Sequence, residues 1–136
     1  SNKLLTAVIS AANSYIANDT ATAAKELMDI DVSSLPTDDA KKLYNTIAEA
    51  AMKPAANEFY TQGTTAYNKA DYTTAATAFV NAYKCDSTKA EAAYYAAKSY
   101  VALNQTEDAK KYYQYIVNDF KTSGYYKEAN DYVTSH

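Results

Sequence analysis

The sequence contains little glycine or proline and lacks arginine and tryptophan. With two Gly and two Pro in 136 residues, the chain can form few tight turns and no glycine-rich phosphate-binding loop. All 13 basic residues are Lys, so bidentate arginine contacts to guanine or phosphate are excluded. The net charge of −3 also argues against a nucleic-acid surface. These absences favour a helical protein without a nucleic-acid partner.

Residues that support catalysis or bind metals are equally scarce. The single cysteine is Cys85 and the single histidine is His136, the last residue. A His/Cys metal cluster and a nucleophile activated by an internal histidine are therefore both excluded. Carboxylate pairs at 38–39 and 107–108 lie where helices are expected to begin, and there they complement the helix dipole. We expect no enzymatic activity, no cofactor and no metal site.

Long apolar runs are also missing. The longest, AAYYAA at 92–97, is far shorter than the roughly 20 residues of a membrane-spanning helix, so we expect no membrane insertion by this segment. The absence of Arg beside abundant Tyr, Thr and Lys resembles the composition of bacterial extracytoplasmic domains. That resemblance implies a location outside the cytoplasm, with anchoring to the cell envelope by a segment absent from this chain. A cytoplasmic location is the alternative.

Apolar residues recur at spacings of three and four along most of the chain, which predicts amphipathic helices. A stripe over 3–17 is interrupted at 18–20, where Asp19 or Thr20 can cap the next helix. Asp71 is a second expected N-cap. Because of Pro54, residues 37–70 can form either two helices or one long kinked helix. A proline can end one helix, begin the next, or lie within a kinked one.

The strongest signal is an internal repeat with a period of 34 residues. Shifting the chain by this period superposes Gly63 on Ala97, Ala75 on Ala109, Phe79 on Tyr113 and Ala82 on Ile116. Small residues let paired helices approach closely, so we expect Gly63 and Ala97 to face small residues on the second helix of each pair. Phe79 and Tyr113 are then expected to fill the space between neighbouring pairs. A fixed period of this length is typical of stacked helical repeats.

Over about residues 57–123 this pattern resembles the tetratricopeptide repeat (TPR) family. The resemblance rests on Phe59, Gly63, Asp71, Tyr72, Ala75, Phe79, Ala82 and Asp86 in one unit and on Ala97, Tyr100, Ala109 and Tyr113 in the next. It implies an all-α fold: a short solenoid of about six to seven antiparallel helices with a right-handed superhelical twist. The single domain, 1–136, would comprise a degenerate hairpin (4–36), an extra helix (37–55), two repeat units (56–89 and 90–123) and a capping helix (124–136).

The chain contains fifteen tyrosines, far more than usual. In the TPR family the first helices line a concave groove, so the resemblance implies a groove formed by Asn57, Tyr60, Thr64, Tyr67, Asn68, Glu91, Tyr94, Lys98 and Tyr125. Tyr combines an apolar ring with a hydroxyl and suits both peptide and glycan contacts. The leading hypothesis is a non-catalytic scaffold that binds a peptide segment of a partner protein. The alternatives are a cell-wall glycan-binding module that uses the same tyrosines, and a structural spacer that self-associates.

Overall fold

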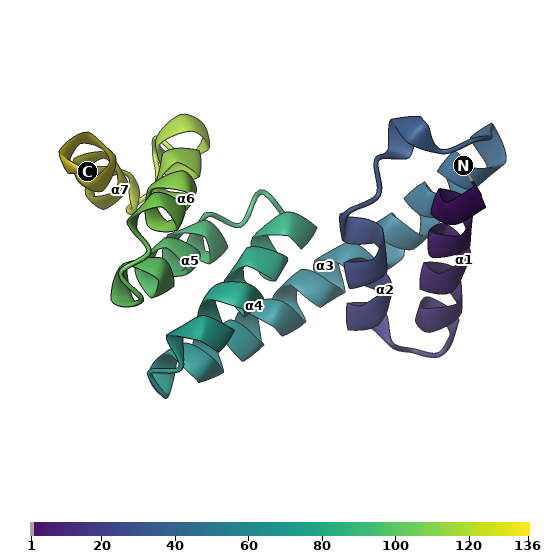
Figure 1. Ribbon diagram of the computed structural model, residues 1–136, viewed down its shortest axis with the longest axis horizontal. Helices are drawn as coiled ribbons and strands as arrows, with labels where there is room; N and C mark the ends of the chain where they lie inside the picture. The colour runs from purple at the N-terminus through teal and green to yellow at the C-terminus, as the bar shows by residue number, and fades with distance from the viewer. Residues whose placement is uncertain (1) are drawn as a thin grey trace. The chain divides into compact units, whose positions relative to one another are not determined.

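The computed structural model describes residues 2–136, and these form seven α-helices and one short 3-10 helix (Figure 1). In order they are α1 (Asn2–Ile16), α2 (Thr20–Met28), η1 (Val32–Ser34), α3 (Asp38–Asn68), α4 (Tyr72–Cys85), α5 (Ala90–Ala102), α6 (Thr106–Asp119) and α7 (Tyr126–Ser135). These residues contain no strand, so the all-α prediction is confirmed. Within the same range, no helix combines the length and hydropathy needed to cross a bilayer.

α2 and α4 begin at the two expected N-caps. Asp19 and Asp71 each accept a hydrogen bond from the backbone N–H three residues later, at 3.2 and 3.3 Å. The Thr37 hydroxyl accepts the corresponding bond from Ala40 at 3.1 Å, which places the acidic pair 38–39 in the first turn of α3. Each cap satisfies a backbone donor that the helix itself leaves unpaired.

The region around Pro54 forms one helix. α3 runs from Asp38 to Asn68 with Pro54 inside it, so the expected boundary between residues 55 and 56 falls within a helix. The residues group into two compact units, 1–58 and 59–136.

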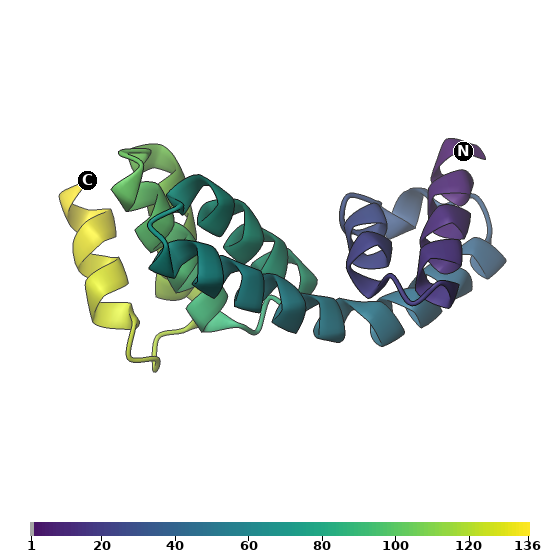
Figure 2. The ribbon, with the colours of Figure 1, turned by 90° about the horizontal axis from the view of Figure 1, so that it is seen from below.

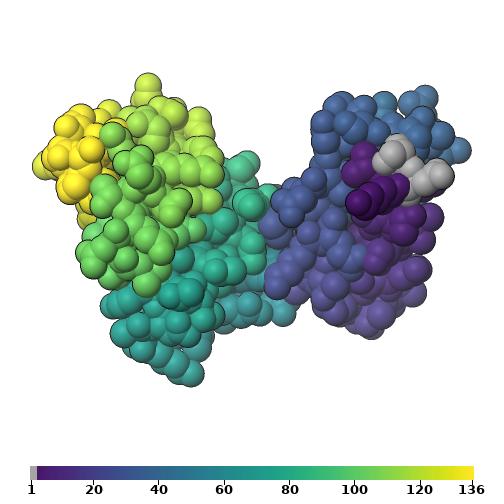
Figure 3. Space-filling model, viewed as in Figure 1, coloured from purple at the N-terminus to yellow at the C-terminus, as the bar shows by residue number. Residues whose placement is uncertain are grey.

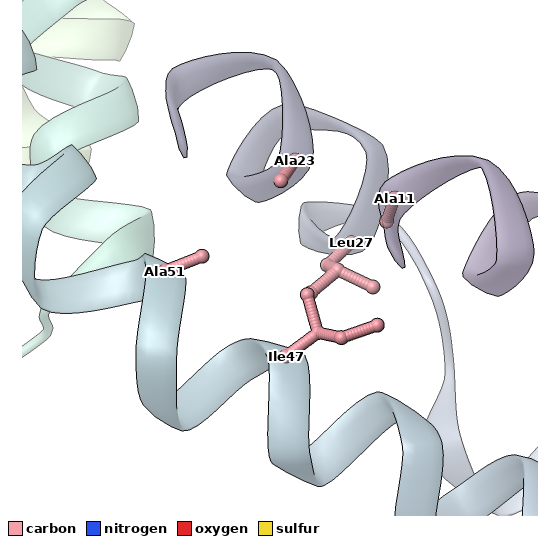
Figure 4. Packing of buried hydrophobic residues seen from close by; sticks show 5 residues of the cluster. All are labelled: Ala11, Ala23, Leu27, Ile47 and Ala51. Carbon is pink, nitrogen blue, oxygen red and sulfur yellow. The ribbon is translucent and has the colours of Figure 1, made fainter. Parts of the chain in front are cut away.

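The first unit has a core of small and branched side chains from α1, α2 and the beginning of α3. One cluster is shown in Figure 4, where the side chains of Leu27 and Ile47 point toward each other; it consists of Ala11, Ala23, Leu27, Ile47 and Ala51. A second cluster consists of Val8, Leu35 and Ala40. The alanines let the helix backbones approach closely, because they leave little side chain between them.

In the second unit, α4 packs against α5, α5 against α6, and α6 against α7 (Figures 1 and 2). The space-filling view shows the atoms of α6 and α7 in direct contact (Figure 3). The small residues of the predicted repeat are fully buried, and its large residues are at most 2% exposed. These residues are Ala75, Phe79, Ala82, Ala97, Ala109, Tyr113 and Ile116.

Gly63 lies directly against the ring of Phe79, a contact that was not expected from the repeat. A Cβ atom built at Gly63 would lie 2.8 Å from two carbons of that ring. Gly63 therefore makes room for an aromatic side chain, which accounts for a glycine in the middle of α3.

The turn between paired helices is built three times in the same way. The residues with left-handed backbone are Asn18, Ala70 and Asn104, with φ of 62°, 59° and 59°. In each turn the next residue donates its backbone N–H to the carbonyl oxygen five positions earlier at 2.9 Å, the pattern of a Schellman motif. The second and third turns are 34 residues apart, and so are both ends of α4 and α6. The predicted period is thus present in the backbone of the second unit.

Replacing Ala70 by Gly is expected to raise the free energy of unfolding by about 0.5–1 kcal/mol. An L-residue with a Cβ atom is strained at φ 59°, whereas Gly is not, and this gain exceeds the entropy that Gly adds to the unfolded chain. Denaturant titration measures the change. Asn104→Gly is the matched variant and should gain less, because Asn tolerates this conformation. A loss at Ala70 would argue against the left-handed turn.

Replacing Ala75 or Ala109 by Leu is expected to cost about 1–3 kcal/mol, because both positions are fully buried and the larger side chain overpacks the helix contact. Thermal or denaturant unfolding gives the value. Thr77→Leu places the same side chain at an exposed position of α4 and should change stability by no more than about 0.5 kcal/mol. If the alanine variants were as stable as the parent, these alanines would not lie at the helix contact.

Candidate functional site

Phe79 lies at the centre of a network of aromatic rings in the second unit. Its ring stacks on Tyr95 of α5, with 5.6 Å between centroids and 28° between planes. Tyr60 and Tyr67 of α3 meet it edge-on, at 5.4 and 6.4 Å. Tyr67 also contacts Tyr95 at 5.7 Å. These contacts hold side chains of α3, α4 and α5 in one fixed arrangement, because packed rings leave little freedom of rotation.

Tyr94 extends the network toward α7. Its ring contacts Tyr95 at 5.0 Å and stacks on Tyr125 at 4.3 Å with 20° between planes. Tyr113 of α6 lies 6.3 Å from Tyr94 and 4.9 Å from Tyr132 of α7. The rings therefore form one connected wall from α3 to α7.

Glu128 of α7 joins this wall through three polar contacts. The hydroxyls of Tyr94 and Tyr113 donate to its two carboxylate oxygens, each at 3.0 Å, and Lys98 Nζ lies 3.8 Å from Oε2. Burial, together with the hydrogen bond to Glu128, raises the pKa of Tyr94 and of Tyr113 far above the ordinary tyrosine value. Both hydroxyls are therefore protonated donors at neutral pH.

Glu128 was not among the residues expected in the groove, although the repeat carries a signal for it. Tyr60, Tyr94 and Glu128 are spaced by the 34-residue period and lie on α3, α5 and α7. Equivalent positions of successive repeats are neighbours in a stacked array, so Glu128 could have been paired with Tyr94 from the period alone.

Two hollows open beside the rings. The small hollow, of about 160 Å³, is lined by Tyr60, Thr64, Tyr67, Asn68, Phe79 and Tyr95. The large hollow, of about 530 Å³, has a lining that includes Tyr67, Lys98, Val101, Glu128, Asp131 and Tyr132. Tyr67 belongs to both, so the two hollows adjoin at its ring.

The structure brings together most of the residues expected to form a groove. Four line the small hollow (Tyr60, Thr64, Tyr67 and Asn68), and Lys98 lines the large one. Tyr94 and Tyr125 stack on each other within the aromatic wall. Glu91 pairs with Lys89 at 3.7 Å. Asn57 is exposed on α3 and belongs to the first unit. Three residues that line the hollows were not expected there: Phe79, Tyr95 and Asp131. Phe79 and Tyr95 line the small hollow because their rings pack against each other and against Tyr67.

An ammonium group lies between an aromatic ring and a carboxylate at two places on this surface. Lys89 Nζ is 5.4 Å from the centroid of Tyr60 and pairs with Glu91. Lys98 Nζ is 5.7 Å from the centroid of Tyr94 and pairs with Glu128. Burial, with a smaller contribution from Glu91, also raises the pKa of Tyr60. The ring faces of Tyr60 and Tyr94 are thus already in contact with cations.

The remaining reactive groups offer little chemistry. Burial and the neighbouring Asp86 raise the pKa of the Cys85 thiol to about 11, so it is protonated and weakly nucleophilic at neutral pH. Within residues 2–136, no three His, Cys, Asp or Glu side chains come together in a way that could hold a metal ion. The two hollows and the rings that border them bring polar and aromatic groups together, and we call this surface the groove.

Comparisons of the chain with protein-family models, with curated proteins and with solved structures found no match. What the groove can do is therefore inferred from its own chemistry. Its half-buried rings offer apolar contact, and its hydroxyls, the Asn68 amide and three charged groups offer polar contact. A concave surface that combines apolar rings with a few polar groups is typical of ligand-binding sites.

Proposed function

We propose that this protein is a non-catalytic interaction domain whose second unit binds an extended peptide segment of a partner protein. The observation that carries the proposal is the pair of hollows that adjoin at Tyr67. A cavity of about 150 Å³ is large enough for a benzene-sized group. The small hollow, about 160 Å³, therefore fits one aromatic or branched aliphatic side chain. The large hollow, about 530 Å³, leaves room for residues that follow in the same peptide.

We also infer that the second unit is a short right-handed solenoid of antiparallel helix pairs, of the TPR type. The recurrence of the Schellman turn and of α4 in α6 after 34 residues supports this inference. The same turn between α1 and α2 supports a degenerate pair in the first unit. In such a solenoid, the first helices of successive pairs face one concave surface, which would present Tyr60, Tyr94 and Glu128 together.

The covered ring faces favour a peptide over a glycan. A sugar ring stacks on a flat aromatic face that is open to solvent, and several such faces in a row are needed for an oligosaccharide. The Tyr60 face carries Lys89, and the Tyr94 ring carries Lys98 and is stacked on Tyr125. The hollows between the rings remain, and they suit side chains of a peptide.

Two expectations from the sequence stay predictions. One is an extracytoplasmic location with anchoring to the envelope; the other is self-association of a purely structural spacer. Sedimentation at rising protein concentration tests the second, because a spacer should associate without any ligand.

Filling the small hollow is expected to weaken peptide binding about tenfold or more, because a contact residue becomes a steric block. Thr64 is an exposed residue of α3 that lines this hollow, and Thr64→Phe places a ring in it. The matched control is Thr65→Phe, one residue further along and outside the small hollow. Both threonines donate to the carbonyl four residues earlier, so both variants lose a similar bond.

The measurement uses a library of short extended peptides on beads, screened with the labelled parent protein, and then titration of the selected peptides against the two variants. Circular dichroism checks that both variants keep their helices. Equal loss for the two variants would contradict the groove. Retention on N-acetylglucosamine oligomers with no peptide selected would contradict peptide binding and favour the glycan alternative.

A further inference from the structure

We propose that the large hollow selects a Lys or Arg side chain of the bound peptide; the inference rests on the peptide-binding function proposed above. A long basic side chain has two parts, an apolar stem and a cationic end, and snorkels so that each part reaches a suitable environment. The large hollow offers both environments.

The apolar part of the hollow lies on α3 and α5. Val101 is unusually exposed for a large apolar residue, at 39%, and it lines the hollow together with Ala102 and Tyr67. A side chain laid across these three residues would remove apolar surface from water. The methylene groups of Lys or Arg supply such a side chain.

The charged groups of the hollow are two carboxylates of α7 and one ammonium of α5, so negative charge is in excess among its lining residues. Its lining contains two carboxylates, Glu128 and Asp131, and one ammonium, Lys98. Lys98 lies beside Glu128, at 3.8 Å. Asp131 pairs with Lys127 at 3.3 Å, but their side chains are 66% and 90% exposed, and such surface pairs contribute little free energy. A cation of the ligand can therefore displace Lys127 from Asp131 at small cost.

The protein's own lysines show how this surface holds a cation. Lys89 and Lys98 each lie over a tyrosine ring and beside a carboxylate. Asp131 supplies a carboxylate to the large hollow, whereas the ring of Tyr132 is stacked on His136 at 3.9 Å, so the carboxylates are the groups that would meet a ligand cation. An acidic side chain would bring like charge to Glu128 and Asp131, and an uncharged one would leave Asp131 with its weak surface partner. Charge complementarity thus favours a basic occupant.

The test compares three forms of one peptide selected from the bead library: the form with Lys or Arg, a norleucine analogue and a Glu analogue. We expect the basic form to bind most tightly. Asp131→Asn should weaken its binding about fivefold, the upper range for an exposed ion pair. Lys127→Gln should strengthen it about twofold, because Asp131 loses its competing partner. The norleucine analogue should respond to neither substitution. Asp119→Asn, an exposed carboxylate of α6 outside the hollow, is the charge-matched control.

The outcomes separate the two proposals. Selected peptides without a basic residue, or basic and norleucine forms that respond equally to Asp131→Asn, would overturn the charge selection and leave peptide binding intact. A library from which the parent protein selects nothing would overturn both. Because Lys127→Gln is expected to increase affinity, general damage to the fold cannot imitate the supporting result.

Discussion

Replacing Phe79 by Ala is expected to lower the free energy of unfolding by about 3–5 kcal/mol, the range found for truncation of buried aromatic residues. Phe79 is 1% exposed and contacts the rings of Tyr60, Tyr67 and Tyr95. Its removal leaves a cavity where α3, α4 and α5 meet, and the surrounding rings can refill it only by leaving their own contacts.

Denaturant titration followed by circular dichroism measures this loss. Phe79→Leu, which keeps most of the apolar volume, should remain folded and lose only part of the amount, so the series is informative even if the alanine variant does not fold. Phe120→Ala is the matched control, since Phe120 is only half-buried beyond the end of α6. An equal loss at both positions would contradict the central role of Phe79.

The effect of Gly63→Ala should change sign with residue 79. In the parent, the added Cβ lies 2.8 Å from the Phe79 ring, and overpacking of about 1–3 kcal/mol outweighs the gain in helix propensity of about 1 kcal/mol. In the Phe79→Ala background the space is open, and the same substitution should stabilise by up to about 1 kcal/mol. Gly124→Ala, where an added Cβ would meet no other side chain or backbone within 4 Å apart from its chain neighbours, is the control for glycine replacement. A double-mutant cycle without coupling would contradict this contact.

The helices and their caps could be predicted from the sequence because both obey local rules. Asp19 and Asp71 cap helices through the backbone N–H three residues away, a contact that needs no tertiary structure. The 34-residue period was likewise visible, since small residues recur wherever helices cross. The same period predicts which positions are neighbours in successive helices, as for Tyr94 and Glu128.

The finer contacts could not be predicted, because they depend on side-chain direction and on distances between helices. Nothing local shows that Gly63 accommodates a ring rather than a small residue. A proline within a helix costs about 3 kcal/mol, so Pro54 alone favours a break. The buried Ala51, Ala55 and Phe59 on the same helix offset that cost through packing. Among the residues that line the hollows, Tyr60, Thr64, Tyr67, Asn68 and Lys98 were expected from the sequence. Tyr95 and Asp131 were not, because their places beside the hollows depend on how the helices pack.

Raising the pH above about 10 is expected to destabilise the second unit by several kcal/mol. Tyr112 is 6% exposed, and burial raises its pKa from the ordinary value of 10.0 to about 12. In the unfolded chain Tyr112 therefore loses its proton at lower pH than in the folded chain. The stability from this group is fully present below pH 10 and is lost as the pH rises toward 12, by about 3 kcal/mol. Tyr113, 2% exposed and with a pKa raised further, adds at least as much.

The measurement follows helix content by circular dichroism and tyrosinate formation by near-ultraviolet absorption across the same pH range. The two signals should change together for the buried tyrosines, because these rings ionise only when the helices separate. Tyr112→Phe removes an ionisable hydroxyl and should move the alkaline midpoint upward. Tyr15→Phe, at a more exposed ring of the first unit, is the control and should not move it. If all the tyrosines ionised while the helix signal stayed constant, the rings of α6 would be open to solvent, and the packed aromatic wall that borders both hollows would be absent.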